Sequence, residues 1–137
     1  MAKIVVDATG AVLGRVGSYV AKELLKGNSV EVINSEKVII SGSHKEFVSK
    51  VRAKRNMGRG SSLNGPWIDR KEDRMLKRII RGMLPWDRPK GREAYKNLRC
   101  HIGVGDLNAD EIKSAKTVAI QKPMKFTTLK EVVRSLR

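Results

Sequence analysis

The sequence has few of the residue types on which disulfide frameworks, metal sites and aromatic cores depend. Its 137 residues include one cysteine, two histidines and only 4% aromatic residues. A lone Cys100 excludes an internal disulfide and suits a reducing compartment. The chain starts without a long apolar segment, and no unbroken apolar run exceeds three residues. We therefore expect neither export nor insertion into a membrane.

Acidic residues are also scarce. There are 14 Asp and Glu residues against 29 Lys and Arg residues, which gives a formal net charge of +15 and a pI near 10.4. The excess is uneven, because residues 45–92 hold 15 basic and 5 acidic residues and so +10 of the +15. Excess positive charges repel one another in a compact state, and a polyanionic partner is the natural explanation for them.

The side chains that could bind a metal or act as nucleophiles are poorly placed. His44, Cys100 and His101 are the good zinc ligands, but neighbours in a strand point to opposite faces, and three ligands leave a closed tetrahedral site one short. The same geometry argues against a Cys-His nucleophile pair, and Ser61 and Ser62 have no obvious base. We expect no metal, no cofactor and no catalytic residue.

Three glycines follow a predicted strand and enter a predicted helix, which is the setting of a nucleotide-binding loop. The spacing of Gly10, Gly14 and Gly17 does not fit Gly-x-Gly-x-x-Gly, and no Gly-x-x-x-x-Gly-Lys-Ser/Thr occurs. We favour glycines that let the helix pack closely, with Asp7 stabilising the turn. A nucleotide-dependent enzyme that uses residues 7–17 remains the alternative.

The most informative stretch is residues 69–86. Its apolar residues recur at helical spacing with basic residues between them, so one face should be core and the other cationic. We expect a capping box of Asp69 and Glu72 at its start, and Gly82 with Pro85 at its end. The apolar stripe consists of Met75, Leu76, Ile79, Ile80 and Met83.

The rest of the chain alternates strands with helices. This order predicts an α/β fold with a mainly parallel sheet in a single domain, 1–137, with an exposed basic loop and helix region at about 50–92. Capping boxes are expected at Ser43 with Glu46 and at Thr128 with Glu131. Residues 103–125 give no clear assignment. The predicted strands are 3–7, 30–33, 38–40 and 98–102, the further helices begin near 13, 44, 93 and 129, and 56–66 is an exposed loop.

The basic region contains the candidate nucleic-acid contacts. Both tryptophans bracket the cationic helix, where they could stack on bases or pack against the core, and both possibilities stay open. The candidate RNA-binding residues are Lys50, Arg52, Lys54, Arg55, Arg59, Trp67, Arg74, Lys77, Arg78, Arg81, Trp86, Arg88, Lys90 and Arg92.

Three motifs give the chain a resemblance to a known family. They are Asp-Ala-Thr-Gly-Ala-Val-Leu-Gly-Arg at 7–15, Val-Ile-Asn-Ser-Glu-Lys-Val-Ile-Ile-Ser-Gly at 32–42, and Arg-Gly-Met-Leu-Pro at 81–85 with Gly91 and Leu98-Arg99 behind. In these the chain resembles the ribosomal protein L13 family of the large subunit, in its archaeal and eukaryotic branch.

The resemblance implies a three-layer α/β/α fold around a small sheet of about four strands and no catalytic activity. It also implies a place in the cytoplasmic ribosome, with large-subunit ribosomal RNA and neighbouring large-subunit ribosomal proteins as partners and no small-molecule substrate. A free-standing nucleic-acid-binding regulator is a further alternative. The sequence lacks the helix-turn-helix, zinc-finger and basic-zipper patterns that would favour it.

Overall fold

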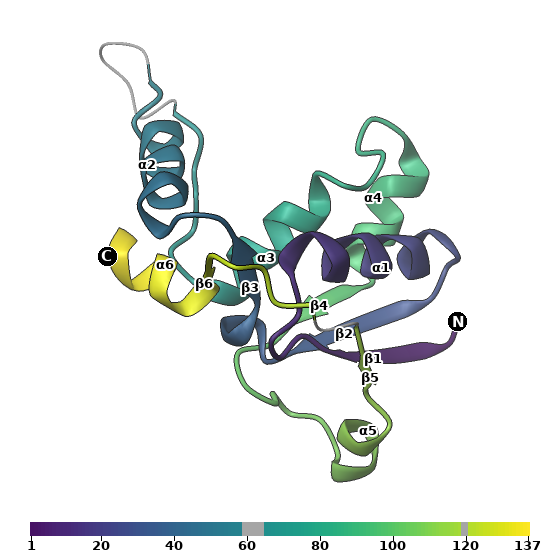
Figure 1. Cartoon of the computed structure of the whole chain (residues 1–137). Coiled ribbons are helices and arrows are strands. Elements are labelled where there is room, and N and C mark those ends of the chain that lie inside the picture. Colours follow the sequence, from purple (N-terminus) through teal and green to yellow (C-terminus); the bar gives the residue numbers. More distant parts are fainter. Residues whose placement is uncertain (59–64, 119–120) are drawn as a thin grey trace.

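The computed structural model describes residues 1–58, 65–118 and 121–137. At its centre is a parallel sheet with the strand order β4-β2-β1-β5 (Figure 1). The prediction of an α/β fold with a mainly parallel sheet of about four strands is confirmed. The strands are β1 (Lys3–Asp7), β2 (Ser29–Ile33), β4 (Leu98–Cys100) and β5 (Lys116–Thr117).

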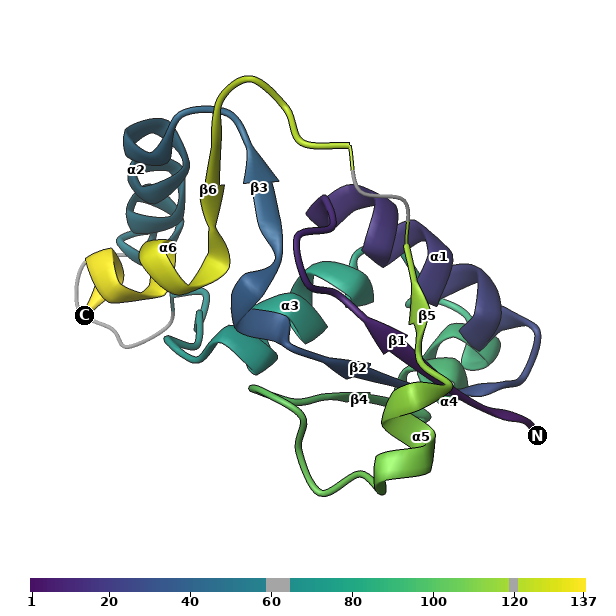
Figure 2. The ribbon, with the colours of Figure 1, turned by 60° about the horizontal axis from the view of Figure 1, so that its bottom comes forward.

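Helices cover both faces of this sheet, but unequally. From β1 through β2 to β4 the chain moves in one direction across the sheet, so right-handed connections place their helices on one face. The return to β5 places a short helix on the other face (Figure 2). The outer layers are therefore α1 (Leu13–Leu25), α3 (Glu72–Arg81) and α4 (Pro89–Lys96) on one side and α5 (Ala109–Lys113) on the other.

The two faces of the sheet differ in polarity. Val6, Val30 and Val32 point toward α1 and α3 and are fully buried in the hydrophobic core. On the opposite face the Lys3 Nζ lies 3.6 Å from Glu31 Oε1 and 2.8 Å from Glu111 Oε1 of α5. This alternation along each strand places the large core on one side of the sheet, whereas the other side combines the buried Val5 and Ile33 with the ion pairs of Lys3.

A second, two-stranded sheet stands beside the first. The strand predicted at 38–40 forms as β3 (Ile39–Ser41), but it pairs antiparallel with β6 (Phe126–Thr128) outside the parallel sheet (Figure 2). The chain changes direction after β2 because Asn34 adopts a left-handed φ of 55° before the 3-10 turn Ser35–Lys37. Two helices accompany this sheet: α2 (His44–Arg55) and α6 (Leu129–Leu136).

One of the three predicted capping boxes forms. Glu131 N donates to Thr128 Oγ1 at 3.4 Å and Thr128 N donates to Glu131 Oε2 at 3.1 Å, so the box at α6 is confirmed. The predictions of capping boxes at α2 and α3 were wrong. Ser43 precedes α2 without a side-chain cap bond, and Lys71 rather than Asp69 stands at the N-cap of α3.

Other boundaries also differ from those predicted. The helix expected from residue 93 begins at Pro89, because proline is well suited to the first helical position. The strand expected at 98–102 ends at Cys100. Among the residues that the structure describes, no helix is both long enough and apolar enough to cross a membrane.

Candidate nucleic-acid interface

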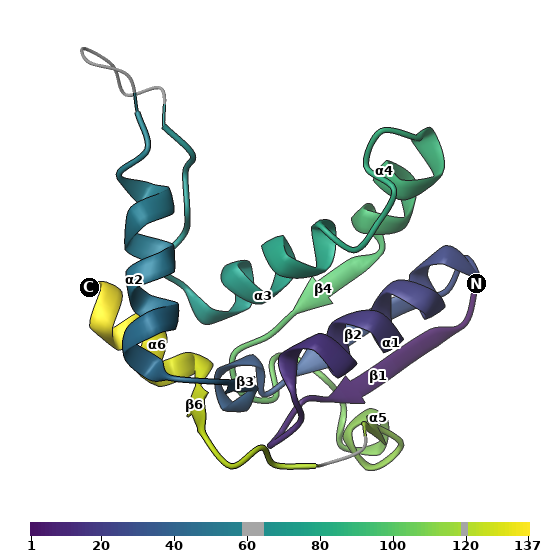
Figure 3. The same ribbon diagram turned by 45° about the horizontal axis from the view of Figure 1, so that its top comes forward.

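Three helices carry most of the predicted contacts, and they lie on one side of the molecule. Figure 3 shows α2 and α4 rising at the two ends of α3, so that α3 forms the floor of a saddle. We call the exposed surface of α2, α3 and α4 on this side the saddle surface. Apart from the two outer ends of α2 and α4, the residues forming it belong to residues 45–92, which hold +10 of the net charge.

The basic residues of α2 point in two directions. Lys50 and Lys54 are exposed on the side that faces α3. Arg52 Nη2 instead donates to the Ser135 carbonyl oxygen at 2.7 Å, and Arg55 Nη1 donates to the Leu136 carbonyl oxygen at 3.3 Å. The two arginines therefore bind the last carbonyls of α6, where a cation also complements the helix dipole.

The α3 helix has the two faces that the sequence predicts. Its buried residues include Met75, Leu76 and Ile80, with exposures of 4%, 0% and 0%. Met83, predicted as the last member of the apolar stripe, lies beyond the helix end and is 40% exposed. Arg74, Arg78 and Arg81 are exposed, and Lys77 is half-buried.

Each cation of α3 has a partner within the fold. Arg74 Nη1 lies 3.4 Å from Asp69 Oδ1. Arg78 donates to the Trp67 carbonyl oxygen. The Lys77 ammonium lies 5.0 Å from the centre of the Tyr95 ring, and the Arg81 guanidinium lies 4.0 Å from the centre of the Trp86 ring. These contacts orient the cationic groups without burying them, apart from Lys77.

The structure separates the two tryptophans, which the sequence treats alike. Trp86 is half-buried, with Arg81 against its ring and Tyr95 edge-on at a centroid distance of 5.3 Å. Trp67 is 81% exposed. An indole that remains in water is available to stack on a base, whereas the ring of Trp86 already packs within the protein.

The start of α4 adds three exposed cations. Arg88 is its N-cap residue, and Lys90 and Arg92 lie in its first turn. Arg92 is fixed by its Nε donating to the Trp86 carbonyl oxygen and its Nη2 donating to the Asp87 carbonyl oxygen, both at 3.1 Å. Cations at a helix N-terminus are repelled by the positive end of the helix dipole. An anion bound there would be attracted both to the cations and to the dipole.

Not every candidate can be placed, and some were missed. Arg59 lies outside the described residues. Arg70 and Lys71, directly before α3, are exposed and continue its basic run, but the set of candidates omits them. Their signal was present in the sequence. An apolar cleft between α2 and α3 had no such signal, since its walls come from segments far apart in the chain.

The turn after β1 is built from its own side chains. Asp7 Oδ1 accepts hydrogen bonds from Thr9 N at 3.0 Å, Thr9 Oγ1 at 2.7 Å and Asn34 Nδ2 at 3.0 Å. Nucleotides in doubly wound folds bind at this end of the strands. Here the Asp7 carboxylate holds the turn together, as the sequence suggested. Gly17, in turn, lets α1 lie close to the segment that follows α3, because a Cβ there would lie 2.7 Å from the Met83 sulfur.

This turn yields a prediction about acid stability. Burial alone would raise the pKa of Asp7, but hydrogen bonds from Thr9 and Asn34 and the charge of Lys37 lower it below the usual value. A carboxyl with a lowered folded-state pKa stabilises the fold above its unfolded pKa, and that stability is lost as the pH falls through the folded value.

Asp7→Ala should therefore lower the free energy of unfolding by about 1.5–3 kcal/mol at pH 7, the usual range for hydrogen bonds to a charged group. The difference from the wild type should shrink as the pH falls below about 4. Urea titrations across this pH range measure it, with the exposed Asp106→Ala as control. A constant difference at every pH would mean that the carboxylate charge is not what stabilises the turn.

The remaining reactive side chains have structural surroundings. Burial raises the pKa of the Cys100 thiol to about 12, which keeps it protonated and unreactive. His44 Nδ1 lies 3.0 Å from Thr127 Oγ1 and its Nε2 lies 2.9 Å from Ser135 Oγ, and these contacts join α2 to β6 and α6. Within residues 1–58, 65–118 and 121–137, no three His, Cys, Asp or Glu side chains come together as a metal site.

An α/β fold with a concentrated cationic helical surface defines a candidate nucleic-acid-binding protein. The profile of the family described as "Ribosomal protein L13" matches residues 2–105. The chain therefore belongs to the ribosomal protein L13 family, as its motifs suggested.

Individual relatives agree with this assignment. The chain is 40% identical over 136 residues to the large ribosomal subunit protein uL13 of Archaeoglobus fulgidus, an alignment that covers 96% of this chain and 86% of the relative. It is 43% identical over 117 residues to uL13 of Methanosarcina barkeri, covering 85% and 79%. It is 39% identical over 137 residues to uL13 of Methanocaldococcus jannaschii, covering 96% of each. All three are archaeal proteins, which places the chain in the predicted branch.

Proposed function

We propose that this protein is a structural component of the large ribosomal subunit that binds large-subunit ribosomal RNA through the saddle surface and helps its assembly. It acts in the cytoplasm, within the ribosome, as a binding protein rather than an enzyme. The observation that carries the proposal is the concentration of +10 of the +15 net charge in residues 45–92, whose helices lie on one side of the fold.

The exposure and contacts of the side chains suit different residues of this surface to different roles in RNA binding. Lys50, Lys54, Arg88 and Lys90 extend into solvent and are suited to phosphates. The α3 arginines are exposed but held in place, so they lose less conformational freedom on binding. Trp67 offers a stacking surface. Arg52, Arg55 and Trp86 support the surface through the contacts that they make within the protein.

Neighbouring large-subunit proteins are the second class of partner that we propose. The family of the chain and the names of its relatives support a position in a particle made of both RNA and protein. A native preparation should sediment with large ribosomal subunits in a sucrose gradient at moderate salt. Recovery only as free protein, from cells with intact ribosomes, would contradict the proposal.

Binding to large-subunit RNA should weaken steeply with salt. Between six and ten phosphate contacts predict a slope of log affinity against log salt of roughly −4 to −9. Filter binding or fluorescence anisotropy between about 50 and 200 mM KCl would measure the slope. A slope near −1 would show that most of the basic surface remains in water when RNA binds.

A further inference from the structure

A cleft of about 620 Å³ opens between α2 and α3, within the size range of small-ligand sites. Phe47 and Val51 line it from α2, and Met75 and Ile79 line it from α3. Leu13, at the start of α1, adds to the apolar lining, as do Ala53, Met57 and Ile68. The cleft is thus an apolar recess within the saddle surface.

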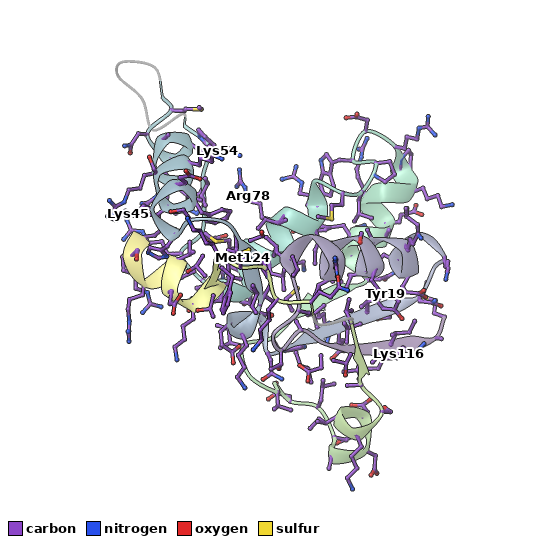
Figure 4. The ribbon with its side chains drawn as sticks, viewed as in Figure 1. Tyr19, Lys45, Lys54, Arg78, Lys116 and Met124 are labelled. Carbon is purple, nitrogen blue, oxygen red and sulfur yellow. The ribbon has the colours of Figure 1, made fainter. Side chains whose placement is uncertain are left out.

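Three cations also line this recess. Lys50 and Lys54 come from successive turns of α2, and Arg78 comes from α3. Figure 4 labels Lys54 and Arg78 beside the space between the two helices. The described residues that line the cleft include no Asp or Glu, so nothing within it neutralises these charges. An apolar interior beside three cations matches an occupant with a flat apolar part and an attached anion.

We propose that the cleft binds one unpaired nucleotide of the RNA. Its base lies between the apolar walls, and its phosphates bind Lys50, Lys54 and Arg78. This inference rests on the proposed function and specifies how the RNA is recognised. Proteins that recognise RNA by sequence take up bases that are splayed out of single-stranded loops and bulges, and apolar or aromatic side chains hold the faces of such bases.

Charge complementarity favours RNA over a protein segment. A basic protein segment, as rich in Lys and Arg as this chain is, would be repelled by the three cations. An acidic apolar peptide would also fit the cleft. Its carboxylates would, however, compete with the RNA phosphates for the further cations of α3 and α4, which we propose the RNA binds. A single RNA molecule, by contrast, can place a nucleotide in the cleft and its neighbouring phosphates on the surrounding cations.

Ala53→Phe tests the inference without changing the charge. Ala53 is exposed on α2 and lines the cleft, so a phenylalanine there can occupy the space without disturbing the core. Ser49→Phe is the matched control, because Ser49 is exposed on the same helix but does not line the cleft. The RNA is the fragment of large-subunit RNA that the wild-type protein protects from nuclease.

We expect Ala53→Phe to weaken binding about ten-fold at every salt concentration, as the loss of one stacked base would. Its salt slope should equal that of the wild type, because no ionic contact is removed. Ser49→Phe should bind as the wild type does. Cross-linking with 4-thiouridine in the same fragment should modify peptides of α2 and α3 in the wild type, and Ala53→Phe should lose these cross-links.

Other outcomes separate the inference from the proposed function. Unchanged affinity of Ala53→Phe, with a steep wild-type slope and no cross-links in the cleft, would overturn the nucleotide site and leave the RNA-binding function standing. Cross-links from the cleft to another protein in native large subunits would overturn it in favour of a peptide. A shallow wild-type slope would remove the proposed function itself.

Discussion

Replacing Gly91 with alanine should lower the free energy of unfolding by more than about 3 kcal/mol, among the larger effects of single substitutions. Gly91 is buried in the first turn of α4, where a Cβ would overlap the Pro85 carbonyl oxygen and lie 2.6 Å from the carbonyl carbon. Backbone cannot swing aside as a side chain does, so the turn before α4 has to shift. Urea unfolding followed by circular dichroism measures the loss.

Gly14→Ala is the matched control. Gly14 lies in α1, and a Cβ there would meet nothing within 4 Å. Alanine restricts the unfolded chain more than glycine does, so this variant should be about 0.5–1 kcal/mol more stable than the wild type. Equal destabilisation by both substitutions would contradict the argument, since it would mean that helix glycines in this fold tolerate no side chain for a reason other than the Pro85 contact.

The Gly91 contact also bears on function. Three candidate phosphate contacts, Arg88, Lys90 and Arg92, lie around the first turn of α4. Because Arg92 donates to the Trp86 and Asp87 carbonyl oxygens, a displaced turn would misplace its guanidinium as well. Gly91→Ala should therefore reduce RNA affinity even under conditions in which the variant remains folded.

The sequence predicted the elements whose signals are local. The α1 helix has a regular apolar stripe, and its Val16, Val20 and Leu24 are buried as expected. The α6 helix has both its stripe and its capping box. The capping boxes predicted at Ser43 and Asp69 do not form, although the right residue types occur at these positions. A capping hydrogen bond depends on the local path of the backbone, which residue spacing does not specify.

The arrangement of the strands depended on contacts that spacing cannot reveal. Ile40 pairs with Thr127, and nothing near either strand indicates this partner. The left-handed Asn34 directs β3 away from the parallel sheet, and asparagine tolerates this conformation without requiring it. An alternating order of strands and helices therefore identified the class of fold but not the second sheet.

The candidate interface divides in the same way. Charge is visible in the sequence, and Lys50, Lys54 and the α3 arginines are exposed on the saddle surface as predicted. The partner of a cation is not visible when it is distant: Arg52 and Ser135 are separated by 83 residues. Whether a basic residue can reach RNA or is bound within the fold is thus a property of the tertiary structure.

This division predicts opposite behaviour for two pairs of cations on one helix. Lys50→Gln with Lys54→Gln should change stability by no more than about 0.5 kcal/mol, because both side chains are exposed. The same double variant should weaken RNA binding and flatten the salt slope by about two units, one for each phosphate that a lysine no longer neutralises. The measurements are urea midpoints and RNA affinity over a series of salt concentrations.

Arg52→Gln with Arg55→Gln removes the same charge from the same helix, so any long-range effect of net charge is equal in the two double variants. It also removes the hydrogen bonds to the Ser135 and Leu136 carbonyl oxygens, which should cost about 1–3 kcal/mol of stability. Because these arginines point toward α6 and away from the cleft, the salt slope should stay within about half a unit of the wild type, well below the two units expected from the lysine pair. If both double variants flatten the slope equally and neither loses stability, then α2 attracts RNA through its overall charge, and the assignment of its two faces is wrong.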